Sequence, residues 1–384
     1  MNGLLNVNAY IYGEGIKKVN IGFNDGKICF IGNDKNNIKP ICDIPTDAIV
    51  VPGFIDEHIH GAGGYDVMDA TINALDNISL YLAKEGTTSF LATTMTQSHS
   101  KLLNALYTIK EYIKNNNTFG SRLIGAHLEG PFISAKHIGA QPLEYIQKPF
   151  IEGFKVYNLA SGNNIKIVTL APEEENGLSL VKCLKNEKVV ASIGHSDAKY
   201  VDVENAIKAG AKSIAHTFNA QTGFHHREIG VVGSALLFDE LNCEIICDCI
   251  HVSIPALKLI FKNKPKDKIT LITDSMRAKG LPYSESELGG QKVFIKDGKA
   301  TLADGTLAGS ILRMNVAIKN IIEKCDIPFT DAIDCATANP AKNIGIFDKY
   351  GSISLGKFAD FTVLDKNFNV LLTIVGGNIV FKAK

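Results

Sequence analysis

The two ends of the chain carry a strand-like alternation of hydrophobic and polar positions. In the first fifty residues, short runs of this kind flank Asp25-Gly26, a dipeptide typical of a two-residue hairpin turn. Near the C-terminus, two such runs flank Gly376-Gly377 in the same way. Because an isolated hairpin is only marginally stable, we expect both ends to complete one small β domain, with the termini close together in space.

Between the ends, short β-branched apolar runs alternate with segments of helical spacing, which is typical of βα units and a mainly parallel sheet. Eight runs are predicted strands, at residues 49–56, 87–94, 122–129, 165–172, 189–195, 213–219, 243–250 and 268–274. Helical spacing recurs at residues 73–85, 101–114, 176–187, 199–210 and 316–325. Eight strands favour an α/β fold with a closed, TIM-like (β/α)8 barrel. An open doubly wound sheet is the alternative, but no GxGxxG motif follows the first strand.

One stretch does not fit the barrel pattern. Residues 284–310 contain GGQKVFIKDGKATLADG, which predicts a hairpin with its turn at Asp297-Gly298, and we expect an insertion after the eighth strand. The predicted domains are therefore a small β-sandwich domain made of residues 1–51 and 348–384, and a barrel made of residues 52–347.

The composition is that of an ordinary globular protein, with 45% hydrophobic and 21% charged residues among 384. Forty Lys and Arg balance forty Asp and Glu, so the zero net charge argues against binding to nucleic acid or to an anionic membrane. The N-terminal segment lacks the basic and apolar regions of a signal peptide, and no apolar run approaches the roughly 20 residues of a membrane span. We therefore expect a cytoplasmic protein.

Eight cysteines are spread along the chain without a CxxC pair, which favours reduced thiols. Three of them, Cys243, Cys247 and Cys249, are close enough in sequence to suggest metal ligands. Because their odd spacing falls in an apolar run, we expect them on one face of a buried strand, where they pack in the core.

Histidines and carboxylates stand at the ends of several predicted strands. A buried parallel strand should be apolar throughout, so each of these polar residues needs a reason. They are His58, His60, Glu129, His195, His216, His251 and Asp274. In a barrel the C-terminal strand ends converge on the catalytic face, so groups far apart in the sequence should lie around one point.

Imidazole and carboxylate groups are ligands of borderline divalent metals. His58 and His60, two positions apart on an extended segment, project to the same side as a chelating pair, although two solvated loop histidines would give the same motif. A metal held by Glu129, His195 and His216 would keep an open position, where bound water loses a proton near neutral pH. The pattern therefore indicates a hydrolytic metal site.

Asp274 could accept the proton of that water and pass it to a leaving amine. The alternatives are that Asp274 caps the segment after the eighth strand or ligates a metal. No lysine ends the fourth strand, so Glu129 is the only plausible bridging carboxylate if two metals bind. Neither a GxSxG motif nor a Cys-His nucleophile arrangement is evident.

The polar residues lie in a series of motifs: PGFIDEHIHGAGG (52–64), HLEGPFIS (127–134), GHSDA (194–198), HTFNAQ (216–221), HHREIG (225–230), TDSMRAKGLP (273–282) and LAGS (307–310). These motifs resemble those of the amidohydrolase superfamily and, more narrowly, of the N-acetylglucosamine-6-phosphate deacetylase family. The segment GKFADF (356–361) is similar to the family's return into its small β domain. The resemblance thus covers nearly the whole chain.

The resemblance implies hydrolysis of the acetamide of N-acetyl-D-glucosamine 6-phosphate to D-glucosamine 6-phosphate and acetate. It implies that Glu129, His195 and His216 hold the principal metal, and that His58 and His60 complete a second site with Glu129 as the bridge. This chain has both histidines of the pair, His58 and His60, so it could hold two ions. The metal could be iron, zinc, manganese or cobalt, because these ligand types suit all four.

The resemblance also assigns the remaining site residues. Asp274 becomes the general base and acid, and His251 lies against the substrate. The phosphate is expected to meet the backbone amides of Asn219 and Ala220 together with His226 and Arg227, and Arg227 is expected to reach into the neighbouring subunit of a homodimer. Gln141 is a further substrate-binding candidate, at a position where some family members carry histidine.

Small departures from the family pattern leave open how the substrate is recognised. The common HLFNAM is HTFNAQ here, beside the expected phosphate loop, and TDAM is TDSM. N-Acetylgalactosamine 6-phosphate, which differs at one hydroxyl, is the alternative substrate. Another amidase of the same superfamily and a non-catalytic barrel scaffold are more distant alternatives.

Overall fold

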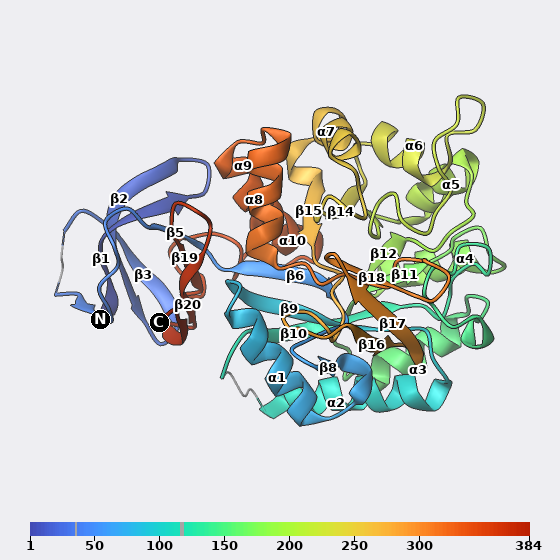
Figure 1. Ribbon diagram of the computed structural model, residues 1–384, viewed down its shortest axis with the longest axis horizontal. Helices are drawn as coiled ribbons and strands as arrows, with labels where there is room; N and C mark the ends of the chain where they lie inside the picture. Colours follow the sequence, from blue (N-terminus) through green and yellow to red (C-terminus); the bar gives the residue numbers. More distant parts are fainter. Residues whose placement is uncertain (35–36, 116–118) are drawn as a thin grey trace.

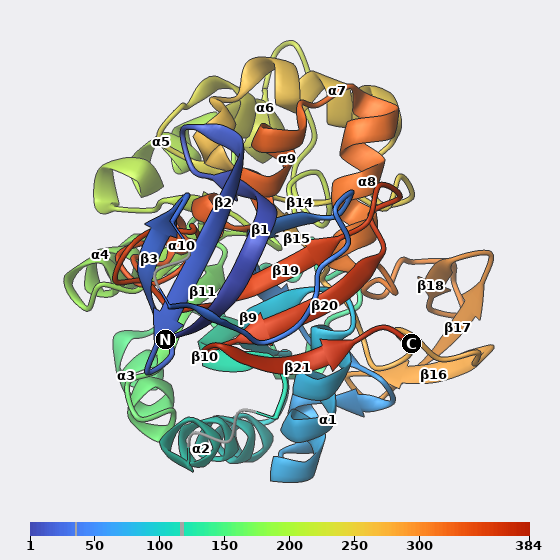
Figure 2. The same ribbon diagram turned by 90° about the vertical axis from the view of Figure 1, so that its left-hand side faces the viewer.

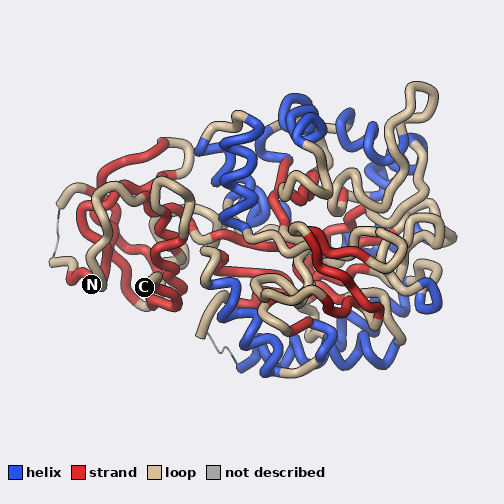
Figure 3. The backbone as a smooth tube through the Cα atoms, viewed as in Figure 1, coloured by secondary structure: helices blue, strands red, loops and turns tan. Residues whose placement is uncertain are grey.

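The computed structural model describes residues 1–34, 37–115 and 119–384. Figure 1 shows two bodies side by side: a sheet that carries both chain ends, and a larger barrel surrounded by helices. Figure 3 shows that helices dominate the outside of the larger body, while strands make up most of the smaller one. Within the described ranges, no helix has the length and apolar character needed to cross a membrane.

Over the described residues, the larger body is built on eight parallel strands, which confirms the predicted (β/α)8 barrel. In spatial order they are β6 (Phe54–Ile59), β9 (Thr87–Thr94), β10 (Arg122–Glu129), β11 (Ile165–Leu170), β12 (Val190–Ile193), β13 (Ser213–Ile214), β14 (Asn242–Ile246) and β15 (Ile269–Ile272). Backbone hydrogen bonds bring the two edges together: Asp274 N–H donates to the His58 carbonyl at 2.8 Å, and His60 N–H to the Ser275 carbonyl at 2.9 Å. The catalytic-face ends of β6 and β15 are therefore joined.

Several of the barrel helices are amphipathic and bury their apolar faces against the strands. They are α1 (Ile72–Ala83), α2 (His99–Asn115), α3 (Ile151–Ala160), α4 (Gly177–Asn186), α5 (Tyr200–Ala209), α6 (Gly230–Leu237), α7 (Ile254–Asn263), α8 (Met314–Cys325), α9 (Phe329–Ala336) and α10 (Ala338–Asn343). Short elements in the connections are β7 (Gly61–Ala62), β8 (Tyr65–Asp66), η1 (Val67–Asp69), η2 (Leu143–Tyr145) and η3 (Lys266–Lys268).

The smaller body is a mixed sheet to which both ends of the chain contribute (Figure 2). Its order is β21 (Asn378–Lys382), β20 (Val370–Val375), β19 (Phe361–Leu364), β5 (Ile49–Pro52), β1 (Asn2–Ile11), β2 (Gly15–Asn24) and β3 (Lys27–Gly32), with β4 (Lys39–Pro40) paired to β1. Asp25 and Gly26 form the predicted two-residue turn, with φ of 49° and 74°. The pairing of β19 with β5 joins the C-terminal segment to the N-terminal one.

The run at residues 49–56, predicted as one barrel strand, belongs to two sheets. Its first half is β5 of the small sheet, and its second half begins β6 of the barrel. Gly53 separates them, and a Cβ there would lie 2.1 Å from Thr88 Oγ1. The hydrophobic pattern could not show this division, because both halves are mostly apolar and largely buried in their own sheets.

The predicted core packing of the cysteines is correct for Cys243 and Cys247, which are both fully buried in the barrel core. The predicted placement on one strand is wrong for two of them, because β14 ends at Ile246 and Cys247 and Cys249 lie beyond it. Cys249 is partly exposed and has a left-handed backbone with φ of 65°. All eight cysteines are free thiols.

The predicted insertion forms a three-stranded antiparallel sheet of β16 (Glu285–Leu288), β17 (Gln291–Lys296) and β18 (Lys299–Thr301), with the expected turn at Asp297-Gly298. Its apolar side packs with Met95 at the end of β9. Figure 1 shows this sheet in front of the barrel. The insertion therefore contributes to the mouth of the barrel.

One hydrogen bond between the two bodies predicts a pH-dependent stability. Tyr10 of β1 donates its hydroxyl hydrogen to Asp334 Oδ1 of α9 at 2.8 Å. Burial raises the pKa of Asp334 to about 6, although this hydrogen bond opposes the rise. The folded protein therefore binds the proton more tightly than the unfolded chain, so stability falls as the pH rises from about 4 through 6.

We expect Asp334→Asn to raise the free energy of unfolding by about 1 kcal/mol at pH 8, a figure reduced for partial solvent screening, and to have no such effect near pH 4. The amide oxygen still accepts the Tyr10 hydrogen. Urea unfolding at the two pH values measures the effect. Asp331→Asn, on the same helix in an exposed pair with Lys266, is the control and should give no gain at either pH. An equal gain for Asp334→Asn at both pH values would contradict the prediction.

Candidate active site

The polar residues predicted at strand ends lie together at the C-terminal mouth of the barrel. His58 is in β6 and His60 follows it, while Glu129 is the last residue of β10. His195, His216 and Asp274 each stand two positions after their strands, β12, β13 and β15, and all three have a left-handed backbone, with φ of 48°, 28° and 46°. Such conformations are costly and cluster at functional sites, where surrounding structure holds them in place.

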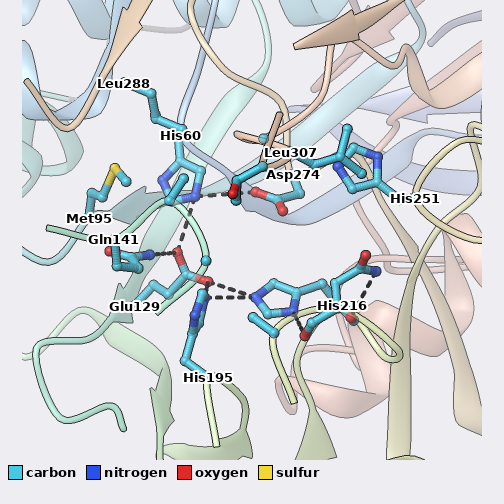
Figure 4. Close-up of a pocket in the computed structure, with 16 residues that line it drawn as sticks. His60, Met95, Glu129, Gln141, His195, His216, His251, Asp274, Leu288 and Leu307 are labelled. Atoms are coloured by element: carbon cyan, nitrogen blue, oxygen red, sulfur yellow. Dashed lines mark hydrogen bonds and ion pairs between the residues drawn. The ribbon is translucent and has the colours of Figure 1, made fainter. Parts of the chain in front are cut away.

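Glu129 is the centre of the cluster (Figure 4). Its Oε1 lies 3.2 Å from His58 Nε2, 3.3 Å from His195 Nε2 and 3.1 Å from His216 Nε2. Its Oε2 lies 3.2 Å from His60 Nε2 and accepts a 2.7 Å hydrogen bond from Gln141 Nε2. Burial raises the pKa of Glu129, but the surrounding imidazoles outweigh this effect and hold it well below its usual value. One ionised carboxylate therefore faces four imidazoles.

Asp274 closes the cluster on the pocket side. Its Oδ1 is 3.2 Å from His60 Nε2 and 3.8 Å from His58 Nε2, and its side chain is 13% exposed, more than the 4% or less of these two histidines. Burial raises the pKa of Asp274, but His58 and His60 together lower it to about 2. Asp274 is thus ionised at neutral pH and able to accept a proton.

The second ring nitrogen of most of these histidines has a fixed partner. His195 Nδ1 donates to the His137 carbonyl at 2.9 Å, and His216 Nδ1 donates to the Asn219 carbonyl at 3.1 Å. His58 Nδ1 lies 2.9 Å from a carboxylate oxygen of Glu244. Each of these partners only accepts hydrogen bonds, so each ring is committed to carry its hydrogen on Nδ1.

This arrangement fits a metal ion. His195 Nε2 and His216 Nε2 lie 3.1 Å apart, and with both Nδ1 atoms protonated, two neutral rings direct lone pairs at the same point. Only a cation or an added proton makes such a contact favourable. Ligand atoms of His58, His60 and Asp274 lie within 4.8 Å of one another, as do those of His58, Glu129 and His216. Oxygen and imidazole ligands of this kind suit a divalent metal.

A third group of potential ligands includes His127 with His58 and Glu244, but His127 is already engaged. Its Nδ1 lies 3.1 Å from the Glu57 carbonyl, and its Nε2 lies 2.7 Å from Thr169 Oγ1. Burial holds the pKa of His127 well below its usual value, so this ring is neutral. His127 therefore supports the floor of the site.

A cavity of about 240 Å³ opens above the cluster. Among the predicted site residues, those that line it are His60, Glu129, Gln141, His195, His216, Asn219, Ala220, His251 and Asp274. His251 is held by Asp248, whose Oδ2 lies 2.6 Å from His251 Nδ1. His58 lies beneath the cavity and contacts it only through its neighbours.

The structure also shows lining residues that the sequence did not indicate. Met95, Leu288, Thr306 and Leu307 also line the cavity, and the last three belong to the insertion after β15. Figure 4 shows Leu288 near His60, and Leu307 near Asp274 and His251. The hairpin motif was visible in the sequence, but nothing in it showed that the hairpin folds toward the barrel mouth. Glu244 and Asp248 were missed as well, because both lie in or just after a run interpreted as apolar core.

Four predicted substrate-binding residues either lie away from the cavity or already bond to other protein groups. His226 and Arg227 are exposed on the segment before α6, which projects beside α5 and α6, and they do not line the cavity of their own chain (Figure 1). The backbone N–H of Asn219 donates to the His216 carbonyl at 2.9 Å. Gln141 Oε1 accepts from Thr96 N–H while its amide donates to Glu129, so both ends of this side chain are engaged.

Comparison with known proteins agrees with this site. The model of the Amidohydrolase family matches residues 49–380, so the chain belongs to the amidohydrolase family. An N-acetylglucosamine-6-phosphate deacetylase from Bacillus subtilis (strain 168) is 45% identical over 375 residues, which cover 97% of this chain and 95% of that protein. Within the amidohydrolases, the chain is thus a member of the N-acetylglucosamine-6-phosphate deacetylase family.

Two further relatives bear on structure and substrate. The crystal structure of the N-acetylglucosamine-6-phosphate deacetylase from Pasteurella multocida superposes with a TM-score of 0.93 at 30% identity, with all of both chains covered. An N-acetylgalactosamine-6-phosphate deacetylase from Escherichia coli O157:H7 is 34% identical over 341 residues, which cover 88% of this chain and 90% of that protein.

Proposed function

We propose that the protein hydrolyses the acetamide of N-acetyl-D-glucosamine 6-phosphate to D-glucosamine 6-phosphate and acetate. The observation that carries this proposal is the cluster around Glu129, in which four imidazoles and the ionised Asp274 surround one carboxylate at the mouth of the barrel. Family membership then supplies the substrate class. The enzyme is a hydrolase that acts on a linear amide bond.

A divalent metal fits the cluster, and we assign its ligands as follows. Glu129, His195 and His216 would hold the principal ion, and His58 and His60 would complete a second site that shares Glu129. When bound, such an ion lowers the pKa of water and polarises the amide carbonyl. Iron, zinc, manganese and cobalt all suit these ligands.

Asp274 performs the proton transfers in this proposal. Its ionised carboxylate takes a proton from the attacking water as the C–O bond forms at the acetyl carbon. The same proton then passes to the amide nitrogen as the C–N bond breaks, and the amine leaves. His251, which Asp248 holds at the cavity, is placed beside the acetyl carbonyl or a sugar hydroxyl.

The phosphate is assigned to the loop after β13 and to a second subunit. Asn219 and Ala220 line the cavity, and the amide of Ala220 is a candidate donor. His226 and the cation Arg227 are exposed outside their own cavity, so we propose a homodimer in which Arg227 reaches the partner's phosphate. The free cysteines are compatible with a cytoplasmic enzyme, the compartment we propose.

We expect Arg227→Ala to raise KM for the phosphorylated sugar by about 10- to 100-fold and to leave kcat within a few-fold, because a phosphate far from the reacting bond contributes mainly binding energy. Steady-state kinetics measures KM and kcat separately and so checks this prediction. Lys199→Ala, an exposed cation at the start of α5, is the matched control and should change neither constant. An unchanged KM for Arg227→Ala would contradict the phosphate role and favour an amidase whose substrate lacks phosphate.

The test of the substrate compares acetate release from three sugars. N-Acetyl-D-glucosamine 6-phosphate should have the highest kcat/KM, above both its galacto epimer and unphosphorylated N-acetyl-D-glucosamine. The E. coli relative is a reason to include the epimer. A higher kcat/KM for the galacto epimer would reassign the substrate, and no acetate from any sugar would favour a non-catalytic scaffold.

A further inference from the structure

Beneath the site lies a carboxylate for which the proposed mechanism has no role. Glu244 is in the middle of β14, and its side chain is completely buried. Its Oε2 lies 2.9 Å from His58 Nδ1 and 3.3 Å from the backbone N–H of His216. One carboxylate oxygen thus contacts a side chain of β6 and the main chain that follows β13.

We propose that Glu244 is a positioning residue for the metal centre, which orients His58 so that its Nε2 serves as a ligand. The inference rests on the proposed function, because it assumes that His58 binds a metal. An ionised carboxylate can only accept, so His58 must carry its hydrogen on Nδ1 and present the lone pair of Nε2. That nitrogen faces Glu129 Oε1 at 3.2 Å and Asp274 Oδ1 at 3.8 Å.

Glu244 differs from the other groups that orient these histidines. His195 and His216 donate to backbone carbonyls, which are neutral, whereas His58 has a carboxylate partner. A carboxylate raises the basicity of the imidazole that it contacts and strengthens its bond to a metal. His58 also lies deepest, beneath the cavity, where no substrate group can orient it.

A purely structural role explains Glu244 less well. Burying a carboxylate lowers the stability of the fold unless hydrogen-bond donors satisfy both of its oxygens. A hydrophobic residue of similar size at the same position often gives an equal or higher stability. Glu244 Oε1 has no hydrogen-bond partner among the described residues. Within the part of the chain that the structure describes, its only side-chain hydrogen-bond partner is His58, and its second contact is the main chain of His216, another proposed ligand. The contacts of this carboxylate are thus directed at the metal cluster.

The contact with His216 N–H adds a geometric consequence. A single oxygen, Glu244 Oε2, bonds to both the His58 ring and the His216 N–H. It therefore restrains the position of β6, which carries His58, relative to the loop that carries His216. The β14 backbone strengthens this restraint, since the Glu244 carbonyl accepts from Thr217 N–H at 2.8 Å. Glu244 therefore acts on the ligand spacing as well as on the ring orientation of His58.

The test compares metal binding by Glu244→Gln, Glu244→Ala and Glu57→Gln. Glu57 is equally buried and close by, but its side chain accepts from Asn343 Nδ2 and does not contact a proposed ligand, so Glu57→Gln is the matched control. Zinc binding to metal-stripped protein, followed by calorimetry and elemental analysis, gives the affinity and the number of ions per chain. Acetate release is measured separately on each variant.

We expect Glu244→Ala to weaken the site that contains His58 by about 10- to 100-fold, as the loss of an outer partner typically does, and Glu244→Gln to weaken it less. Glu57→Gln should bind zinc as the unmodified protein does. The effect should also disappear in a His58→Gln background, where the double variant should be no worse than His58→Gln alone. Glu244→Gln preserves volume, so it provides the answer if Glu244→Ala fails to fold.

The proposal is overturned if Glu244→Gln, or a folded Glu244→Ala, binds zinc as tightly as Glu57→Gln does, or if the loss persists undiminished in the His58→Gln background. Failure of the proposed function looks different. In that case the unmodified protein releases no acetate, while the zinc affinities still rank as predicted.

Discussion

Replacing Asp274 by Asn is expected to reduce kcat by about 10²- to 10⁴-fold, and we expect the upper part of this range because one carboxylate performs two proton transfers. The amide is nearly isosteric but cannot accept the proton of water at neutral pH. Asp274 is placed for this role, since its carboxylate is ionised and its side chain lines the cavity. Acetate release at saturating substrate measures the loss.

The binding of metal and of sugar phosphate should survive this substitution, because the ligands around Glu129 remain in place. Metal content and the Kd for the substrate, measured on the same preparation, separate a catalytic loss from a loss of structure. Asp197→Asn, on the loop after β12 in an exposed pair with Lys136, is the control and should keep full activity. A kcat of Asp274→Asn within about threefold of the unmodified value would remove Asp274 from the proton transfers.

Replacing Glu129 by Gln should reduce acetate release to a comparable extent, but for a different reason: the variant should lose its metal. Glu129 is the contact shared by His58, His60, His195 and His216, and a neutral amide offers neither the charge nor the second anionic oxygen. The loss of affinity should exceed the about 10- to 100-fold caused by removing an outer partner. Elemental analysis after gel filtration should find little metal on the variant, and acetate release should fall in proportion.

The matched control is Glu173→Gln. Glu173 is a largely buried carboxylate just after β11 that accepts hydrogen bonds from Ser196 and Asp197 without contacting the cluster. It should retain both metal and activity. A Glu129→Gln protein that holds metal as tightly as the control would show that Glu129 is not the shared ligand.

The sequence predicted the barrel and the identity of the cluster for a physical reason. Buried parallel strands are apolar along their whole length, so His58, Glu129, His195 and His216 stand out against their neighbours. The closed barrel then places the ends of all eight strands on one face, and no long-range information is needed to bring these residues together. The roles assigned to them remain predictions that the variants above test.

What could not be predicted depends on contacts between distant segments. Glu244 lies in the middle of a strand and not at its end, and the sequence does not show its 2.9 Å contact with His58, 186 positions away. The insertion carries a clear hairpin pattern, but the pattern does not reveal that Leu288 and Leu307 line the cavity. The division of residues 49–56 between two sheets was hidden for a related reason, because both halves are buried.

The most direct test of the account is a metal titration of acetate release. The protein is stripped with a chelator, and its release of acetate from N-acetyl-D-glucosamine 6-phosphate is followed as Fe²⁺, Zn²⁺, Mn²⁺ or Co²⁺ is added in known ratio to the chain. We predict no release from the stripped protein and a rate that rises with bound ion for at least one of the four metals. Stoichiometric metal binding without acetate release for all four, or undiminished release from the stripped protein, would contradict the account.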